Sequence, residues 1–385
     1  MIPYGRQDIS EADIDAVISV LRSDFLTQGP QVPKFERRVA DYCGAGHAIA
    51  VNSATSALHI ACLALGLGPG DWLWTSPITF VASSNCALYC GARVDFIDID
   101  PRTYNMCPIA LERKLMDAEK AGRLPKVVVP VHFAGQPCNM EEIHRLSLKY
   151  GFRLIEDAAH AIGGKYKGAS IGGCQFSDIS VFSFHPVKII TTGEGGMAMT
   201  NNPALASTMR LLSSHGVTRE AARMTRPPEG PWSYQQVALG FNYRMTDIQA
   251  ALGVSQMDRL DAFVSRRHAL ARRYDELLAS LPVVTPFHHP DGYSGLHLYV
   301  VRLRLDQINR GRAEVFERLR AKGVGVNVHY IPVHTQPYYQ RMGFAAGRFP
   351  EAEKFYREAI TLPMYPRLNE AEQDSVVAAL AECLL

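Results

Sequence analysis

The sequence predicts an α/β fold: a doubly wound, mostly parallel sheet followed by a smaller α+β domain at the C-terminal end. Short apolar segments alternate with amphipathic ones along the first half of the chain, as strands joined by helices do. The segments VVVPV (127–131) and RLIED (153–157) lack polar–apolar alternation, which is typical of parallel strands buried on both faces. Beyond Pro282 the order of the segments changes, and this indicates a second domain.

Element boundaries in the first half follow these segments and a few end signals. The helix at 55–65 ends at Gly66, and GLGPG (66–70) is a turn because it neither follows a strand nor opens a helix. The sequence predicts helices at 11–22, 34–43, 55–65 and 140–150, and strands at 47–52, 72–76, 94–97, 126–131, 153–156, 179–184 and 197–200.

The length of 385 residues exceeds one ordinary core, so we expect a large domain at 1–250 and a small one at 251–385. One long helix at 245–281, opened by Thr246 and Asp247, would link them. A strand at 297–305, a helix at 312–322 and a strand at 325–329 would follow. The segment 214–240 is too long for a simple connection, which favours a functional loop.

Composition excludes several classes of protein. The chain is 47% hydrophobic and 20% charged, with a net charge of +2 and no basic tract, so neither nucleic acid nor a membrane surface is expected as a partner. No apolar run approaches the roughly 20 residues of a membrane-spanning helix, and the N-terminal segment has no signal-peptide core. We therefore expect a cytoplasmic protein.

The eight cysteines are scattered without a CxxC pair and mostly lie in apolar segments, as reduced core thiols do. His329 and His334 have no carboxylate or cysteine beside them, so no metal is expected.

Three segments carry candidate chemistry, and the first contains Lys188. It lies in a turn between two strands, among Val187, Ile189 and Ile190, and a glycine-rich stretch follows. An amine among apolar neighbours loses hydration, its pKa falls, and it becomes able to attack a carbonyl. A solvated loop lysine without a role is the alternative interpretation.

The second segment, NSATS (52–56), joins a strand to a helix. Its short hydroxylated residues cap the helix, and the free N–H groups of the helix start would form an anion site. For this segment alone, plain capping is the favoured interpretation. The third is Asp157, at the carboxyl end of a buried strand, where ligands of open α/β sheets bind. A buried carboxylate needs a cationic partner, either a pyridinium nitrogen or a structural arginine. An anion site, an acid and a lysine are together the groups that an enzyme needs in order to bind and use pyridoxal phosphate.

Longer motifs extend this interpretation over nearly the whole chain. SFHPVKIITTGEGG, EDAAHAIGGKYKG, NSATSALH and LGFNYRMTDIQAALG resemble the signatures of the DegT/DnrJ/EryC1/StrS family of nucleotide-sugar aminotransferases. The resemblance also includes SDFLTQGP and NVHYIPVHTQPYY. It implies the type I fold of pyridoxal phosphate enzymes and a homodimer. Members with histidine in place of the lysine are dehydratases; Lys188 therefore favours transamination.

The resemblance assigns roles to individual residues. Lys188 matches the lysine that bonds to the cofactor, Asp157 the acid at its ring nitrogen, and His160 a polar residue near the ring hydroxyl. Further matches are Phe80 on the ring face; Thr55, Ser56 and Ser183 at the phosphate; Asn242 at the phosphate of the other subunit; and Tyr4, Leu26, Thr27 and Gln28 at the sugar nucleotide. Asn327, His329 and Tyr330 alternate along an expected strand, so they point together towards a cleft, where they would bind substrate, or towards solvent. For Tyr4 and 26–28, simple packing is the alternative, and for Asn242, a cap on the following helix.

The resemblance implies L-glutamate as amino donor and a UDP-linked 4-keto-6-deoxy-N-acetylhexosamine as acceptor, aminated at C4. Another nucleotide-linked keto-sugar, with UDP or dTDP and aminated at C3 or C4, is the alternative. A non-catalytic pyridoxal phosphate-binding regulator is a less favoured alternative, because such regulators usually carry an added DNA-binding domain. A nucleotide-dependent oxidoreductase would need a glycine fingerprint, which this sequence lacks.

Overall fold

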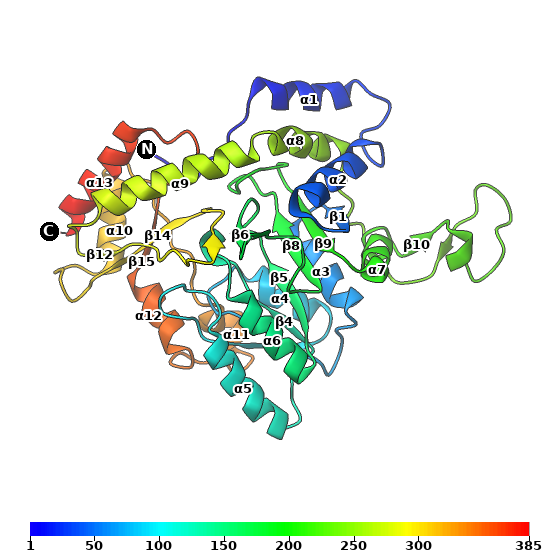
Figure 1. The fold of residues 1–385 in the computed structure, drawn as a ribbon, viewed down its shortest axis with the longest axis horizontal. Coiled ribbons are helices and arrows are strands. Elements are labelled where there is room, and N and C mark those ends of the chain that lie inside the picture. The colour runs from blue at the N-terminus through cyan, green and yellow to red at the C-terminus, as the bar shows by residue number, and fades with distance from the viewer. Residues whose placement is uncertain (385) are drawn as a thin grey trace.

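A seven-stranded sheet with helices on both faces forms the centre of the computed structural model, which describes residues 1–384 (Figure 1). The strand order is β1-β9-β8-β5-β4-β2-β3. Only β9 runs antiparallel to its neighbours, and the other pairs of this sheet are parallel. The strands are β1 (His47–Val51), β2 (Trp72–Thr75), β3 (Arg93–Phe96), β4 (Val127–Val129), β5 (Arg153–Asp157), β8 (Ile179–Ser183) and β9 (Gly196–Thr200).

Each face of this sheet packs against its own helices. Leu154 and Ile155, neighbours on β5, belong to two different apolar clusters because successive side chains of a strand point to opposite faces. One face is covered by α3 (Ala54–Ala64), α4 (Ala82–Tyr89) and α7 (Pro203–Ser213), and the other by α2 (Gln31–Cys43), α5 (Pro108–Lys120), α6 (Met140–Tyr150) and α8 (Asp247–Met257), with α1 (Glu11–Leu21) outside α8. The expected α/β sheet, buried on both faces, is confirmed.

The C-terminal part has its own small antiparallel sheet and its own apolar cluster. Its strands are β12 (Val283–Val284), β14 (Tyr299–Leu303) and β15 (Ala359–Leu362). Its helices are α10 (Arg312–Ala321), α11 (Pro337–Gln340), α12 (Pro350–Glu358) and α13 (Glu370–Leu384), with a 3-10 turn, η3, at Val333–Thr335.

Two sequence predictions for the second half are wrong. The expected helix at 245–281 is two helices, α8 and α9 (Leu260–Leu277), because the backbone leaves helical geometry at Arg259, whose guanidinium is held by ion pairs to Asp8 and Asp13. The segment 325–329 is not a strand: Gly325 donates its N–H to Ile2, and only a single bridge joins Asn327 to Thr361. The strand β15 takes that place beside β14.

Helix α9 connects the two parts of the chain. Its first turns, with Leu260 and Phe263, pack in the apolar cluster of the large sheet, and its later turns, with Leu270 and Tyr274, pack in the C-terminal cluster. The division at residue 250 stays a prediction.

The segment 214–240 projects from the body of the molecule at the right of Figure 1. It holds a short hairpin of β10 (Val217–Thr218) and β11 (Gln235–Gln236), with a 3-10 turn, η2, at Ala221–Arg223. The remaining short elements are β6 (Lys165–Tyr166), β7 (Ala169–Ser170), β13 (Gly292–Tyr293) and the 3-10 turn η1 (Phe133–Gly135).

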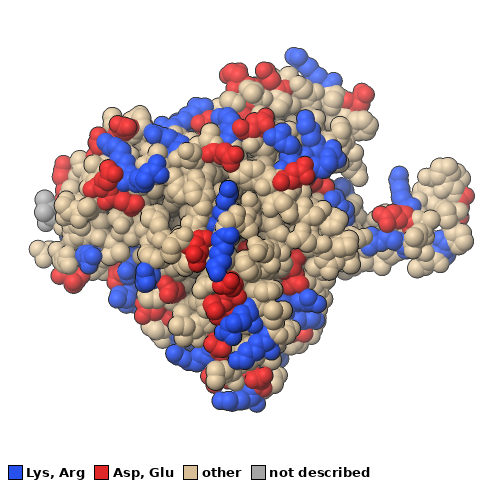
Figure 2. All heavy atoms as spheres, viewed as in Figure 1, with Lys and Arg blue, Asp and Glu red and all other residues tan. Residues whose placement is uncertain are grey.

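Acidic and basic side chains are interspersed over the face of the molecule seen in Figure 2. Within residues 1–384, no helix has the length and apolar character needed to cross a membrane. In the same residues, no cluster of three or more His, Cys, Asp or Glu side chains has the geometry of a metal site. The cytoplasmic location stays a prediction.

Candidate active site

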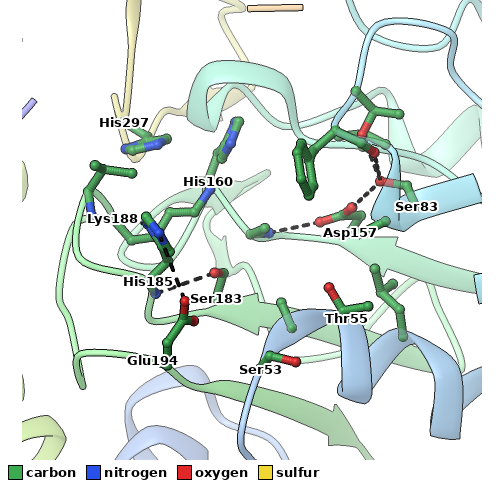
Figure 3. Close-up of a pocket in the computed structure, with 18 of the residues that line it drawn as sticks. Ser53, Thr55, Ser83, Asp157, His160, Ser183, His185, Lys188, Glu194 and His297 are labelled. Carbon is green, nitrogen blue, oxygen red and sulfur yellow. Dashed lines mark hydrogen bonds and ion pairs between the residues drawn. The ribbon is translucent and has the colours of Figure 1, made fainter. Parts of the chain in front are cut away.

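A cavity of about 770 Å³ opens where β5 and β8 end and α3 begins (Figure 3). This volume suits a small organic ligand. Because parallel strands present their carboxyl ends at one edge of a sheet, Asp157 and Ser183 reach the cavity from neighbouring strands. The C-terminal part contributes His297, His329 and Tyr330 to its lining.

Lys188 lies in the turn between β8 and β9. The turn is closed by hydrogen bonds from Thr192 N–H and from Thr191 Oγ1 to the carbonyl of Phe184, and Ile189 and Ile190 are buried beside the lysine. Burial lowers the pKa of Lys188 to about 8, although the charge of Asp157 opposes this shift. A substantial fraction of the amine is therefore neutral near pH 8, as a nucleophile requires.

Asp157 is held in one orientation at the end of β5. One carboxylate oxygen accepts a hydrogen bond from Ser83 Oγ at 2.5 Å, and the other accepts from the N–H of Ala159 at 3.1 Å. The residue is only 6% exposed, and it lines the cavity. Two donated hydrogen bonds stabilise a carboxylate in this setting, so Asp157 is suited to hold a cationic group of a ligand.

The N-terminus of α3 also borders the cavity. Ser53 caps the helix by accepting a hydrogen bond from the N–H of Ser56 at 3.1 Å. Helix geometry leaves the first N–H groups without partners inside the helix, including those of Ala54 and Thr55, and both residues line the cavity. A helix start with free N–H groups of this kind can hold an anion.

Gly196 allows β9 to pass directly under this helix start. A Cβ atom at Gly196 would lie 2.4 Å from the nitrogen of Ala54 and 2.4 Å from the carbonyl carbon of Ser53. No larger residue fits without moving the backbone of the anion site.

Histidine and tyrosine side chains line the part of the cavity beside Lys188. His160 Nδ1 accepts from the N–H of Ala134 at 3.2 Å, so its Nε2–H donates to the Tyr330 hydroxyl at 3.1 Å. Burial, then the charges of Lys188 and His329, hold the pKa of His160 well below its ordinary value. Burial and Lys188 also lower the pKa of His329 to about 3. These imidazoles are neutral near pH 7.

Phe80 stands in the cavity with 60% of its surface exposed. Its ring centroid is 6.4 Å from that of Tyr330. A phenyl ring left uncovered inside a cavity suits the face of a planar ligand.

Many of the residues predicted from the sequence meet in this cavity: Lys188, Asp157, His160, Thr55, Ser56, Phe80, Ser183, Tyr4, His329 and Tyr330. Among residues 1–384, the lining does not include Leu26, Thr27, Gln28, Asn242 or Asn327. Asn242 is exposed, and its carbonyl accepts a 3.5 Å hydrogen bond from Asn52, which does line the cavity. The roles of all these residues stay proposals.

Sequence reasoning missed Ser83 and His297. Ser83 lies three residues after Phe80, and nothing in the sequence around it indicates a hydrogen bond to Asp157. His297 is the last polar residue before the apolar strand β14. A single histidine in this position is only a weak signal of a site residue.

The donor set fits pyridoxal phosphate. The cavity combines an anion site at α3, an oriented carboxylate at Asp157 and an uncovered aromatic ring at Phe80. Within the described part of the chain, Lys188 Nζ has neither a hydrogen-bond nor an ion-pair partner. Lys188, Asp157 and the first turn of α3 would hold the aldehyde, ring nitrogen and phosphate of the cofactor, respectively.

Comparison with known proteins agrees with this geometry. The DegT/DnrJ/EryC1/StrS aminotransferase family model matches residues 7–381. The chain is 39% identical to the spore coat polysaccharide biosynthesis protein SpsC of Bacillus subtilis, over 99% of this chain and 96% of that protein. It is 37% identical to a UDP-4-amino-4,6-dideoxy-N-acetyl-β-L-altrosamine transaminase of Campylobacter jejuni, over 96% of this chain and 94% of that protein.

Solved structures share the whole fold. Helicobacter pylori PseC, an aminotransferase involved in the biosynthesis of pseudaminic acid, superposes with a TM-score of 0.91 at 30% identity, over 100% of this chain and 99% of that one. The pyridoxamine phosphate form of the sugar aminotransferase Spr1654 from Streptococcus pneumoniae gives a TM-score of 0.90 at 31% identity, over 100% and 99% of the two chains. The predicted fold and cofactor are confirmed. The chain therefore belongs to the DegT/DnrJ/EryC1/StrS aminotransferase family, and it is a pyridoxal phosphate-dependent sugar aminotransferase.

Proposed function

We propose that this enzyme transfers the amino group of L-glutamate to C4 of UDP-2-acetamido-2,6-dideoxy-β-L-arabino-hex-4-ulose, in pseudaminic acid biosynthesis. The name of the Campylobacter jejuni relative and the description of the Helicobacter pylori structure support this acceptor and this pathway. The single observation that carries the reaction type is the partly buried Lys188, which lines one cavity with Asp157 and the first turn of α3.

Bound pyridoxal phosphate supplies an electron sink and carries the amino group between the two substrates. Lys188 would hold the aldehyde of the cofactor between turnovers, and its amine would be free to move protons once the donor is bound. The freed Lys188 amine, whose pKa is near 8, then takes the proton from the donor's α-carbon and delivers it to C4′ of the cofactor. In the second half-reaction the same amine moves a proton in the reverse direction, to C4 of the sugar.

The other residues of the cavity bind and orient. Asp157 keeps the ring nitrogen protonated, and Ser83 and the N–H of Ala159 fix its carboxylate. The first turn of α3 and Ser183 hold the phosphate. Phe80 packs on the ring, while Tyr4, His329 and Tyr330 line the part of the cavity that we assign to the sugar.

We further propose a homodimer in which Asn242 completes the phosphate site of the partner subunit. The projecting segment 214–240 supports this assembly, because it exposes large apolar side chains with no cover in residues 1–384: Trp232 (71%), Tyr234 (60%) and Leu239 (80%). Such side chains on an extended arm are typical of a surface that another chain covers.

The test is a substrate panel. Pure enzyme with L-glutamate should convert the UDP-linked 4-keto-6-deoxy-N-acetylhexosamine at least tenfold more efficiently, as kcat/KM, than dTDP-linked or 3-keto analogues (about 1.4 kcal/mol of discrimination). Mass spectrometry and NMR of the product identify the aminated carbon. Higher efficiency with another keto-sugar would replace this acceptor. The 39% identity to SpsC, a spore coat polysaccharide biosynthesis protein, supports testing such other keto-sugars.

A further inference from the structure

An α-amino acid donor brings a carboxylate into the cavity, and the cavity must bind it. Among residues 1–384, no arginine lines the cavity, so the guanidinium fork that usually binds a carboxylate is absent from that lining. Four histidines line the cavity. His160, His297 and His329 are buried, whereas His185 is half exposed with its Nε2 4.0 Å from Glu194. The carboxylate must then be bound by other donors of the lining, and among these the imidazoles lie beside Lys188.

Covalent geometry restricts where this carboxylate lies. The donor's nitrogen takes the position at the cofactor that Lys188 Nζ occupies before the reaction. Two bonds separate that nitrogen from the carboxyl carbon, which places the α-carboxylate about 2.5 Å from it. The group that binds the carboxylate must therefore face the end of the Lys188 side chain.

Two of the three buried histidines already use their ring nitrogens. His160 accepts from the N–H of Ala134 and donates to Tyr330. His329 Nδ1 is bonded to Thr361 Oγ1 at 2.8 Å, and its Nε2 lies 3.5 Å from the side-chain nitrogen of Asn327. Neither has a strong donor left for a ligand.

His297 differs from both. It is only 4% exposed, it lines the cavity, and its Nδ1 is buried without a hydrogen-bond partner anywhere in the described chain. With Nδ1 enclosed by protein, Nε2 is the nitrogen available to a ligand. Burial is the main cause that lowers the pKa of His297, and the charges of His160 and Lys188 add to it, so the ring is neutral and can carry its proton on Nε2.

The backbone holds His297 firmly against the Lys188 turn. Its carbonyl accepts from the buried Arg267 at 3.1 Å. At Gly295 the segment comes so close that a Cβ atom there would lie 3.0 Å from Ile189 and 3.1 Å from the carbonyl of His160. Figure 3 shows His297, His160 and Lys188 together at one end of the cavity, with Asp157 and Ser83 at the other.

We propose that His297 binds the α-carboxylate of the amino donor through a hydrogen bond donated by Nε2–H. This inference deepens the proposed function, since it assigns a residue to the donor half-reaction. It does not depend on glutamate being the donor, because every α-amino acid carries the same carboxylate.

The two half-reactions separate this role from a general structural one. The pyridoxal phosphate form is mixed with L-glutamate alone, and the pyridoxamine phosphate form with the keto-sugar alone, and each conversion is followed by absorbance. His297→Leu should lower kcat/KM for glutamate about 10- to 100-fold, the value of a hydrogen bond to a charged group. The sugar half-reaction should change by no more than about twofold.

Two further measurements sharpen the test. His297→Gln, whose amide can donate from about the position of Nε2, should recover most of the loss, and His288→Leu at a surface histidine is the matched control. α-Methyl-L-glutamate, which has no α-proton to lose, should bind His297→Leu about 10- to 100-fold more weakly in an absorbance titration.

A donor that lacks the α-carboxylate completes a double-mutant cycle, in which the enzyme changes at His297 and the substrate changes at the carboxylate. Wild type should prefer glutamate to its α-amide, isoglutamine, and His297→Leu should lose about 10- to 100-fold of that preference. An unchanged preference, or equal losses in both half-reactions, would overturn the proposal. If wild type reacts with another amino acid in place of glutamate, the donor in the proposed function is wrong, and the same cycle runs on that amino acid and its α-amide.

Discussion

Lys188 has the pKa of a catalytic amine because of where the turn places it. Its neighbours Ile189 and Ile190 anchor the turn in the core, and burial outweighs the charge of Asp157. A lysine of the same sequence context on an open loop would keep its ordinary pKa near 10.5.

The first prediction concerns this pKa. Cofactor-free enzyme should bond covalently to pyridoxal phosphate with a rate that rises with pH and reaches half its maximum at about pH 8, because only the neutral amine attacks the aldehyde. Stopped-flow absorbance of the visible band measures the rate. Lys188→Ala should give no band and no turnover. A half-maximum near pH 10.5 in wild type would show that the turn does not shift the pKa.

Asp157 leads to the second prediction. Asp157→Asn keeps the shape but removes the negative charge, so the ring nitrogen of the cofactor loses its proton and turnover should fall by about two to three orders of magnitude. Asp374→Asn, in an exposed ion pair with Arg273, is the matched control and should leave turnover unchanged. Full activity of Asp157→Asn at full cofactor occupancy would assign the ring nitrogen to another group.

At the scale of elements, the site depends on how closely β9 passes under α3. A Cβ atom at position 196 would collide with the backbone of Ser53 and Ala54 and displace the helix start that borders the cavity, and glycine avoids this collision. Strand and helix are therefore coupled through one residue that has no side chain.

Gly196→Ala should consequently damage both stability and cofactor binding. Its Cβ would meet backbone atoms, which cannot move aside as a side chain can, and overpacking of this kind costs about 1–3 kcal/mol of unfolding free energy. Urea unfolding and a cofactor titration measure the two effects. Gly68→Ala is the control, because a Cβ there meets nothing within 4 Å and the residue caps no helix. Equal behaviour of the two variants would contradict the steric argument.

At the scale of the whole molecule, the projecting segment 214–240 and the exposed Asn242 make sense if two chains share their active sites. Lys188 would then act in one subunit together with Asn242 of the partner subunit.

Complementation tests the shared site. Lys188→Ala and Asn242→Asp chains, each nearly inactive alone, should regain activity when they are mixed, unfolded and re-dimerised, because one site of the heterodimer receives both native residues. With random mixing, half of the dimers are heterodimers and one site in each is native, so the mixture should recover about a quarter of wild-type activity. If both residues acted within one chain, every site would keep one defect and mixing would restore nothing. Mixing Lys188→Ala with itself is the control.

Much of the fold and part of the site could be predicted from the sequence alone. Lys188, Asp157 and the hydroxyl groups at 52–56 all stand where an apolar strand ends, and parallel strands end at one edge of a sheet. The local hydrophobic pattern was therefore enough to predict that these groups lie close together. The family signatures then identified the chemistry.

Tertiary structure decided what local pattern does not encode. Ser83 reaches Asp157 across 74 residues of sequence, and Arg259, at the break between α8 and α9, pairs with Asp8 and Asp13, which lie near the N-terminus. His297 faces the site only because the glycine at 295 lets the C-terminal part pack against the Lys188 turn. Contacts between distant segments depend on how complete domains pack, and a short stretch of sequence carries no periodic signal for them.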